Sequence, residues 1–318
     1  MATSCVFAGG PKERATATIC WPQCINIRGG ALGVALKVVK AMGWEHCLSL
    51  SNPRLRLLLT LDVGPRVIFC GAPDGANLLK VFPGELGLRG GAAWRLYGGH
   101  RFWVCPETKP YPPDNLPVRW EPLPLGARLI QPQEKGVAWR KILEIRMHPR
   151  LGKVLLRHRL VNAGLRPLRI APWALTVLPG GGDAYFPLPR RGRFPAKVNP
   201  SGPLVLWPYT DLGDQRWRFG KRHLFLRVPK GAAKAQKLGA CVPDGWVAYH
   251  RDGIRFKISF RPSPHQGDTD FGSHVELFTQ NGMVELETLG EMKAVAPGKE
   301  LVHEEEWQVG ASKAIPKN

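Results

Sequence analysis

The chain has 318 residues, and its 45 Lys and Arg against 25 Asp and Glu give a formal net charge of +20 at pH 7. This length suits one large β domain or two smaller domains, and 44% apolar residues are enough for a substantial core. The absence of an 18-residue apolar run argues against a membrane span, and there is no RNA-recognition motif, zinc-finger spacing or basic helical stripe.

The basic residues are spread along the chain, and their densest run is the short segment 189–193. A basic surface attracts nucleic acid, anionic membranes or acidic ligands. Because the motifs of nucleic-acid readers are missing, a generally basic surface explains the charge better than a dedicated nucleic-acid site.

The seven cysteines are scattered, and Cys20 and Cys24 are separated by three residues, which is not the spacing of a metal site. Five histidines also lack metal-ligand spacing: His148, His158, His223, His250 and His274. The sequence therefore predicts no metal and no cofactor. A reduced, cytoplasmic chain is expected, since the first residues do not have the charge order of a signal peptide.

Residues 1–43 differ in composition from the rest. A stretch rich in Gly, Cys and Thr comes first, and residues 31–42 have the pattern of a short amphipathic helix that carries Lys37 and Lys40. We expect an N-terminal extension over 1–43 that is disordered or partly helical, followed by one domain over 44–318.

After residue 44 the 36 Gly and 30 Pro of the chain break the sequence into short segments, which is typical of many strands and turns. Loops are expected at 83–93 and 111–115. The predicted strands lie at 54–61 and 67–70 and in three hairpins, 138–147 with 153–161, 246–250 with 254–260, and 274–279 with 283–288.

Two of these hairpins have Asp-Gly or Asn-Gly turns, at 252–253 and 281–282, and both dipeptides tolerate positive φ. Within 254–260 the apolar residues alternate with polar ones, as in a half-buried antiparallel strand. No βαβ rhythm appears, so the predicted fold class is all-β, a large sandwich of antiparallel sheets.

The segment 283–290 is the first candidate for chemistry. Strict alternation places Glu285 and Glu287 on one face of a strand and Val284, Leu286 and Thr288 on the other. A carboxylate on a rigid strand can act as a general base. The alternative is a charged, solvated edge face.

The chain also has 11 Trp, which can stack on sugar rings or fill a bulky core. A series of short motifs then occurs in order between residues 44 and 310. They are LDVGPR at 61–66, YGGHRFWVCPE at 97–107, YPPDN at 111–115, PWALT at 172–176, ELFT at 276–279, LETLG at 286–290, Pro297-Gly298 and His303. Together these blocks resemble the galactose mutarotase-like (aldose 1-epimerase-like) superfamily, and more closely a bacterial branch of it.

The resemblance implies a β-supersandwich that acts on or binds a sugar. In mutarotases a Leu-Glu-Thr segment supplies the base that removes the proton of the anomeric hydroxyl, which makes Glu287 the candidate base. Arg101 stands where an arginine grips sugar hydroxyls. His100 beside it follows two glycines, which permit close approach of the backbone to a ligand, and is the candidate donor to the ring oxygen.

One departure from the family pattern matters. The mutarotase segment that carries the general-acid histidine corresponds here to PWALT, which has no histidine. Either His100 takes this role, or the chain binds sugar without turnover, with Trp173 stacked on a pyranose face. His100 as an ordinary hydrogen-bonded residue is a further alternative.

Arg101 and four further residues are candidates for sugar contact, each with a structural alternative. Arg101 can bind vicinal hydroxyls or form a salt bridge with Glu107, itself a candidate. Asp114 and Asn115 fit a turn after two prolines first and sugar contact second. Asp211 either caps a turn or supplies a carboxylate to the sugar.

Three functions follow, in order of preference. The first is an aldose-epimerase-like protein that opens a sugar ring by acid/base chemistry, on a sugar or, given the charge, an anionic sugar derivative. The second is a carbohydrate-binding domain without turnover. The third, least favoured, is a basic nucleic-acid-binding protein. The oligomeric state is left open.

Overall fold

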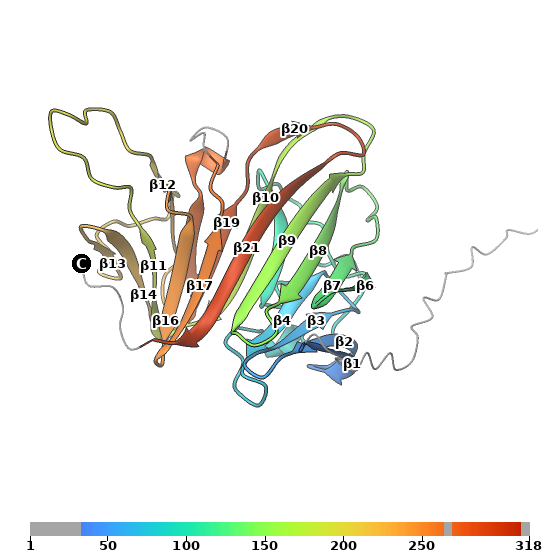
Figure 1. Ribbon diagram of the computed structural model, residues 1–318. Helices are drawn as coiled ribbons and strands as arrows, with labels where there is room; N and C mark the ends of the chain where they lie inside the picture. The colour runs from blue at the N-terminus through green and yellow to red at the C-terminus, as the bar shows by residue number, and fades with distance from the viewer. Residues whose placement is uncertain (1–32, 264–268, 313–318) are drawn as a thin grey trace, which may run out of the picture.

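Two antiparallel sheets packed face to face form the protein, as the computed structural model shows for residues 33–263 and 269–312 (Figure 1). The predicted all-β sandwich is therefore confirmed. Most of the expected N-terminal extension, residues 1–32, lies outside the described residues. The described chain has no helix of the length and apolarity that crossing a membrane requires.

The first sheet has eleven strands in the order β1-β2-β3-β4-β5-β10-β19-β18-β15-β12, with β20 paired to β10. Its strands are β1 (Ala35–Ala41), β2 (Trp44–Ser51), β3 (Arg56–Thr60), β4 (Arg66–Gly71), β5 (His100–Cys105), β10 (Leu168–Pro179), β12 (Leu204–Leu206), β15 (Gln236–Ala240), β18 (Val275–Gln280), β19 (Met283–Leu289) and β20 (Lys293–Val295). The segment with the two glutamates, β19, is thus a central strand and not an edge.

The second sheet has ten strands in the order β13-β14-β11-β16-β17-β21-β9-β8-β7-β6. Its strands are β6 (Arg119–Leu123), β7 (Gly126–Ile130), β8 (Trp139–Met147), β9 (Lys153–Asn162), β11 (Gly182–Pro187), β13 (Trp217–Phe219), β14 (His223–Val228), β16 (Trp246–Arg251), β17 (Ile254–Phe260) and β21 (Glu300–Ala311). Two short 3₁₀ turns, η1 (Pro83–Glu85) and η2 (Asp270–Gly272), complete the elements of the described chain.

The three predicted hairpins are confirmed as β8–β9, β16–β17 and β18–β19. The turn residues behave as their chemistry requires. Asp252 and Gly253 have φ of 51° and 74°, and Asn281 and Gly282 have φ of 44° and 71°. Positive φ at both central residues matches the twist of the flanking strands, which fixes the register of these hairpins.

The helix predicted over residues 31–42 is wrong for the part that the structure describes. Residues 35–41 form β1, which pairs with β2 in the register Leu36 to Leu50. Met42 and Gly43, both at positive φ, make the turn between them. The first sheet therefore includes residues before 44, because burying Leu36 against the sheet outweighs a weak local helical pattern.

The hydrophobic core lies between the two sheets and takes side chains from nearly every strand, among them Leu59, Ile145, Ile258, Leu286 and Trp307. The alternation predicted for β17 is largely confirmed: Phe256 and Ile258 are buried, whereas Ile254 at the strand start is exposed. Such burial on one face of each sheet accounts for the sandwich.

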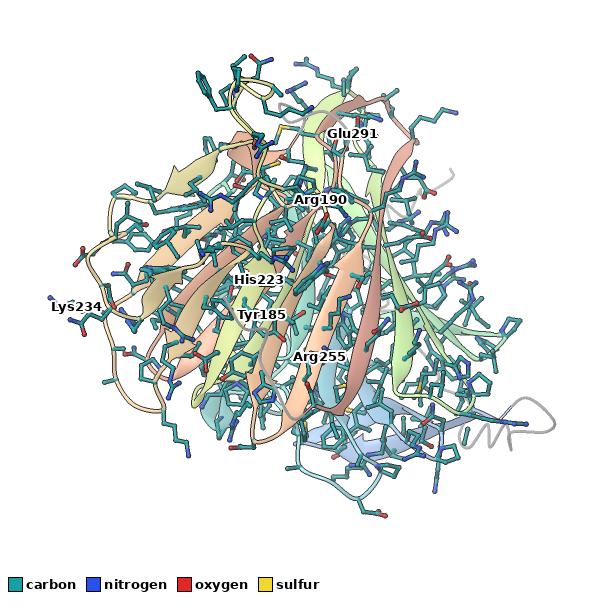
Figure 2. The ribbon with its side chains drawn as sticks, turned by 60° about the vertical axis from the view of Figure 1, so that its left-hand side comes forward. Tyr185, Arg190, His223, Lys234, Arg255 and Glu291 are labelled. Atoms are coloured by element: carbon teal, nitrogen blue, oxygen red, sulfur yellow. The ribbon has the colours of Figure 1, made fainter. Side chains whose placement is uncertain are left out.

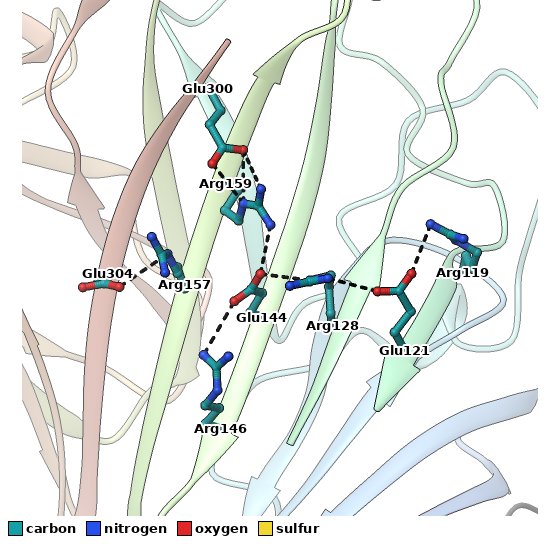
Figure 3. Close-up of polar contacts among 9 residues, drawn as sticks. All are labelled: Arg119, Glu121, Arg128, Glu144, Arg146, Arg157, Arg159, Glu300 and Glu304. Carbon is teal, nitrogen blue, oxygen red and sulfur yellow. Dashed lines mark hydrogen bonds and ion pairs between the residues drawn. The ribbon is translucent and has the colours of Figure 1, made fainter. Parts of the chain in front are cut away.

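The outer face of the second sheet is partly aromatic and partly charged. Tyr185 and Phe225 pack with Trp246, close to the labelled His223 and Arg255 in Figure 2. Elsewhere on this face, four arginines and three glutamates form a network centred on Glu144, and Arg157 pairs separately with Glu304 (Figure 3). Because the charges there nearly balance, this part of the surface does not carry the excess of positive charge.

Four cysteines lie within the described residues, and all four are unpaired and buried: Cys47, Cys70, Cys105 and Cys241. Burial raises the pKa of the Cys241 thiol. A buried, protonated thiol is a weak nucleophile, so these side chains act as small packing residues.

Candidate functional site

A cleft of about 600 Å³ lies on the outer face of the first sheet. Its floor is built by β5, β10, β15, β18 and β19, and loops before β5, after β5 and after β12 form its walls. The charged and aromatic side chains that line it are Trp94, Arg101, Trp103, Glu107, Lys109, Tyr111, Trp173, Trp207, Tyr209, Lys237, Phe278, Glu285 and Glu287. Several tryptophans thus face this cleft and not the core between the sheets.

Strand alternation decides which residues reach the cleft. On β5, Arg101 and Trp103 line the cleft, whereas Phe102 points into the apolar interior. On β19, Glu285 and Glu287 line the cleft, and Leu286 joins the core. The face predicted for the two glutamates is confirmed, but it is a buried cleft floor and not a solvated edge.

Glu287 is held firmly in the floor of the cleft, and 1% of its surface is exposed. Its Oε2 accepts hydrogen bonds from Trp173 Nε1 and from Lys237 Nζ, both at 2.9 Å. Neither bond uses Oε1. The indole and the ammonium therefore fix the carboxyl group in place.

Lys237 compensates the repulsion between two glutamates that face each other on neighbouring strands. Glu276 on β18 stands directly opposite Glu287 on β19, and like charges in this position repel each other. The Lys237 ammonium lies 2.7 Å from Glu276 Oε2 as well as 2.9 Å from Glu287. Burial lowers the pKa of Lys237, but the two carboxylates raise it by more than burial lowers it. The amine therefore stays charged.

Lys237 also lies close to the aromatic walls, with its Nζ 4.9 Å from the ring centre of Trp173 and 4.6 Å from that of Trp207. An ammonium in this position is attracted to the ring faces. The same side chain thus orders the carboxylates of the floor and the aromatic residues beside them.

Arg101 and Glu285 face each other in the cleft, with Nη2 and Oε2 3.6 Å apart. The guanidinium lies near the rings of Trp94 and Trp103. Burial raises the pKa of Glu285, and the Arg101 charge opposes this rise without cancelling it. The alternative of a salt bridge from Arg101 to Glu107 is wrong, since Glu107 instead accepts a hydrogen bond from Tyr111.

Some buried donors of the cleft have no acceptor. Within the described part of the chain, Nε and Nη1 of Arg101 and Nε1 of Trp94 make no hydrogen bond. Buried N–H groups normally have partners, and each one left without a partner costs about 1–3 kcal/mol. A ligand with oxygen acceptors would supply these partners.

Asp114 and Asn115 lie outside the cleft lining and are almost fully buried. Asp114 is 2.9 Å from the Lys141 ammonium and 3.8 Å from Arg66. Asn115 accepts from the Tyr97 hydroxyl and donates to the backbone of the loop at 90–93. Both side chains hold the loops behind the cleft wall.

Asp211 follows β12 and is also outside the cleft lining. Its Oδ1 accepts a hydrogen bond from the backbone N–H of Gly213. Of the two roles considered for Asp211, this contact fits capping of a turn and not sugar binding. Neighbouring Asp214 forms an ion pair with Arg216 at 2.6 Å.

His100 points away from the cleft because it precedes Arg101 on the same strand. It is fully buried between the sheets, with Nδ1 2.9 Å from Thr176 Oγ1 and Nε2 2.9 Å from His158 Nε2. Burial holds the pKa of His100 well below its ordinary value. None of the described residues that line the cleft is a histidine.

The two glycines before His100 serve the fold. A Cβ on Gly98 would lie 2.2 Å from the Lys80 carbonyl oxygen, and one on Gly99 would lie 2.2 Å from that of Val67. These glycines therefore let neighbouring segments of the chain approach each other, where the sequence had suggested approach to a ligand.

Sequence reasoning missed several residues of the site, notably Lys237, Glu276 and Trp207. Lys237 lies on β15, a short strand with no clear alternation, so its place beside Glu287 had no local signal. Glu276 could have been found, because the predicted hairpin of β18 and β19 puts it directly opposite Glu287.

No protein-family model and no curated protein matches the sequence. Among solved structures, a candidate aldose 1-epimerase from Escherichia coli K12 is similar, with a TM-score of 0.56 and 12% identity over 83% of this chain and 98% of that one. A galactose mutarotase related enzyme from Lactobacillus acidophilus has a TM-score of 0.54 and 10% identity over 85% and 100%.

A galactose mutarotase-like protein from Lactobacillus casei is similar as well, with a TM-score of 0.51 and 8% identity over 83% of this chain and 100% of that one. These identities are too low to transfer an activity, but each comparison spans the sandwich as a whole. The chain has the galactose mutarotase-like fold.

Proposed function

We propose that the cleft binds a monosaccharide and interconverts its anomers, with Glu287 as the general base. The observation that carries this proposal is the fixed carboxylate of Glu287, whose Oε2 is held by Trp173 and Lys237 while Oε1 takes part in neither bond. The aromatic walls fit the apolar faces of a sugar ring. The unpaired donors of Arg101 and Trp94 fit its hydroxyl groups.

In this mechanism Oε1 of Glu287 takes the proton of the anomeric hydroxyl while the bond from C1 to the ring oxygen breaks. The ring oxygen receives a proton, and C1 becomes the aldehyde carbon of the open chain. Rotation about the bond from C1 to C2, followed by the reverse proton transfers, closes the ring as either anomer. These transfers return the base and the proton donor to their starting protonation states.

Glu285 is the proposed proton donor to the ring oxygen. It lies two residues before Glu287 on the same face, roughly 6.6 Å away along the strand. Burial raises its pKa, which favours the protonated carboxyl, whereas Glu287 accepts hydrogen bonds from an indole N–H and an ammonium group. Two carboxyl groups in unlike surroundings can thus take the roles of acid and base.

The proposed ligand is an uncharged aldose. The cationic residues of the cleft lining, Arg101, Lys109 and Lys237, are equal in number to its glutamates, Glu107, Glu285 and Glu287. With Glu285 protonated the lining has one positive charge in excess, a small part of the +20 of the whole chain, so an anionic sugar gains little there. Unpaired buried thiols fit a reducing compartment, so we place the activity in the cytoplasm.

The test is NMR measurement of exchange between the α and β anomers of a panel of aldoses and their 6-phosphates. Exchange above the buffer rate with wild type, lost in Glu287→Gln while sugar binding persists, is the expected result. Lys257→Met, on the outer face of the second sheet, is the control that keeps full activity. Buffer-rate exchange with every sugar would exclude turnover on that panel.

A non-catalytic carbohydrate-binding domain is the second candidate, favoured by the lack of a histidine among the described cleft residues. It predicts that sugars raise the melting temperature of the protein without faster exchange. Trp173→Ala should then weaken binding, and Glu285→Gln should leave the affinity nearly unchanged, because proton transfer plays no part.

A further inference from the structure

A group of three potential metal ligands lies in the interior of the sandwich, away from the cleft. His100 on β5, His158 on β9 and Glu305 on β21 have no exposed surface. One donor atom from each lies within 4.8 Å of the other two. We propose that these side chains bind a divalent metal ion of the zinc type between the two sheets.

The orientation of the histidine rings supports this assignment. His158 Nδ1 lies 3.1 Å from the backbone carbonyl oxygen of His303, which can only accept, so the proton is on Nδ1. A neutral His158 therefore presents the lone pair of Nε2, and this atom faces Nε2 of His100 at 2.9 Å. Metal-bound histidines typically donate their second ring N–H to a carbonyl in this way.

His100 has a similar outer contact, with its Nδ1 2.9 Å from Thr176 Oγ1. When the threonine oxygen accepts this bond, Nε2 of His100 carries a lone pair, as Nε2 of His158 does. Two lone pairs that face each other cannot form a hydrogen bond, but they can bind a cation between them. When the threonine donates, His100 Nε2–H bonds to His158 Nε2 and leaves no room for an ion. These two arrangements are the alternatives that experiment must separate.

The surroundings of Glu305 favour the cation. Its carboxyl group accepts hydrogen bonds from the Thr288 hydroxyl and from Trp307 Nε1, which are neutral donors. No lysine or arginine among the described residues forms an ion pair with it. A buried carboxylate without a cation is costly, and buried charges are usually paired or bind metals. Two neutral imidazoles and one carboxylate form a donor set well suited to Zn²⁺.

The position of the site indicates a structural role. His100 belongs to the first sheet, whereas His158 and Glu305 belong to adjacent strands of the second. A bound ion would therefore tie the two sheets together across the core. Because the ligands have no exposed surface, the ion would enter as the chain folds, which couples binding to folding. This inference is independent of the proposed sugar chemistry.

The test begins with elemental analysis of wild-type protein produced in zinc-supplemented medium and freed of loosely bound metal. About one zinc ion per chain is expected. After unfolding in EDTA, refolding with Zn²⁺ should give a higher melting temperature than refolding with EDTA. Refolding with Co²⁺ should give the visible absorption of a low-symmetry cobalt site with nitrogen and oxygen ligands.

Two ligand variants, Glu305→Gln and His158→Gln, should lose the bound metal. The matched control is His274→Gln, which changes a buried histidine just before β18 and should keep the metal. If the ligand variants do not fold, the wild-type measurements decide alone. Wild type with under a tenth of an ion per chain, and no response to Zn²⁺ or Co²⁺ on refolding, overturns the proposal, as does full metal content in both ligand variants.

Discussion

The ammonium group of Lys237 lies 2.9 Å from Oε2 of Glu287, and both side chains are buried in the floor of the cleft. The same ammonium reaches Glu276, the residue directly opposite Glu287 on the neighbouring strand. One cation thus compensates two facing carboxylates. The position of the proposed base therefore depends on a residue from β15, a strand that is not paired with β19.

Removing the cation from this cluster should destabilise the fold. We expect Lys237→Met to lower the free energy of unfolding by about 3–5 kcal/mol, because two buried carboxylates lose their shared partner. Urea denaturation measures the change. Lys257→Met is the control, since it makes the same exchange on the outer face of the second sheet and should cost much less.

A double variant separates loss of charge compensation from loss of packing. Lys237→Met with Glu276→Gln removes one of the two negative charges, so part of the lost stability should return. If the double variant is as unstable as the sum of the two single variants, charge repulsion between Glu276 and Glu287 is not the cause.

The N–H group of Trp173, and not only the surface of its ring, should contribute to the rate of anomer exchange. Trp173→Phe keeps an aromatic ring in the cleft but removes the hydrogen bond to Glu287 Oε2. We expect anomer exchange to fall about tenfold, which corresponds to roughly 1.4 kcal/mol, while sugar affinity changes less. A larger loss of affinity than of exchange rate would show that Trp173 serves mainly to bind the sugar.

The pH dependence of exchange should report on Glu285. Burial raises its pKa above the 4.5 of an unperturbed glutamate, so the carboxyl stays protonated to higher pH. Because the proposed mechanism needs the protonated form, the rate should fall as the pH rises through this raised pKa. The decrease should be absent in Glu285→Gln, whose residual rate is low at all pH values. The same decrease in wild type and variant would exclude Glu285 as the acid.

The network around Glu144 should stabilise the fold at neutral pH and not in acid. Burial tends to raise the pKa of Glu144, but hydrogen bonds from Arg128 and Arg159 outweigh it and hold the pKa below 4.5. A carboxyl with a lowered folded pKa contributes stability that is present above the unfolded value of about 4.5. That contribution is lost as the pH falls through the folded value.

Glu144→Gln should therefore cost about 1 kcal/mol at pH 7, a value typical of partly exposed pairs. The difference between wild type and variant should shrink as the pH falls below 4.5. Urea denaturation at several pH values measures both quantities. If the difference in free energy of unfolding stays constant down to pH 3, the variant is destabilised by altered packing of its side chain and not by loss of the charge.

Local chemistry made much of the fold predictable. The Asp-Gly and Asn-Gly dipeptides at 252–253 and 281–282 fixed two hairpins, and alternation in 254–260 showed which side of a strand is buried. The same alternation placed Glu285 and Glu287 on one face. Strand β1 was missed because a seven-residue segment carries too little periodicity to distinguish a strand from a helix, so pairing with β2 decides its structure.

The site was predictable where it depends on a single strand. Glu287, Arg101 and Trp173 all line the cleft, as the sequence suggested. The prediction for His100 conflicted with a rule already available, because neighbours on a strand point to opposite faces and Arg101 takes the cleft side. Asp114 and Asn115 could not be assigned from sequence, since only the packing of loops against Lys141 and Tyr97 reveals their partners.

The sequence by itself determined three hairpins, the Asp-Gly and Asn-Gly turns of two of them, and the face on which Glu285 and Glu287 lie, since these follow from backbone conformation and a two-residue period. Only the tertiary structure decided that Lys237 stands between Glu276 and Glu287, and that His100 meets His158 and Glu305 between the sheets. The physical reason is that these contacts join residues far apart in the chain. Their distances are set by sheet order and sheet packing, which no local pattern encodes.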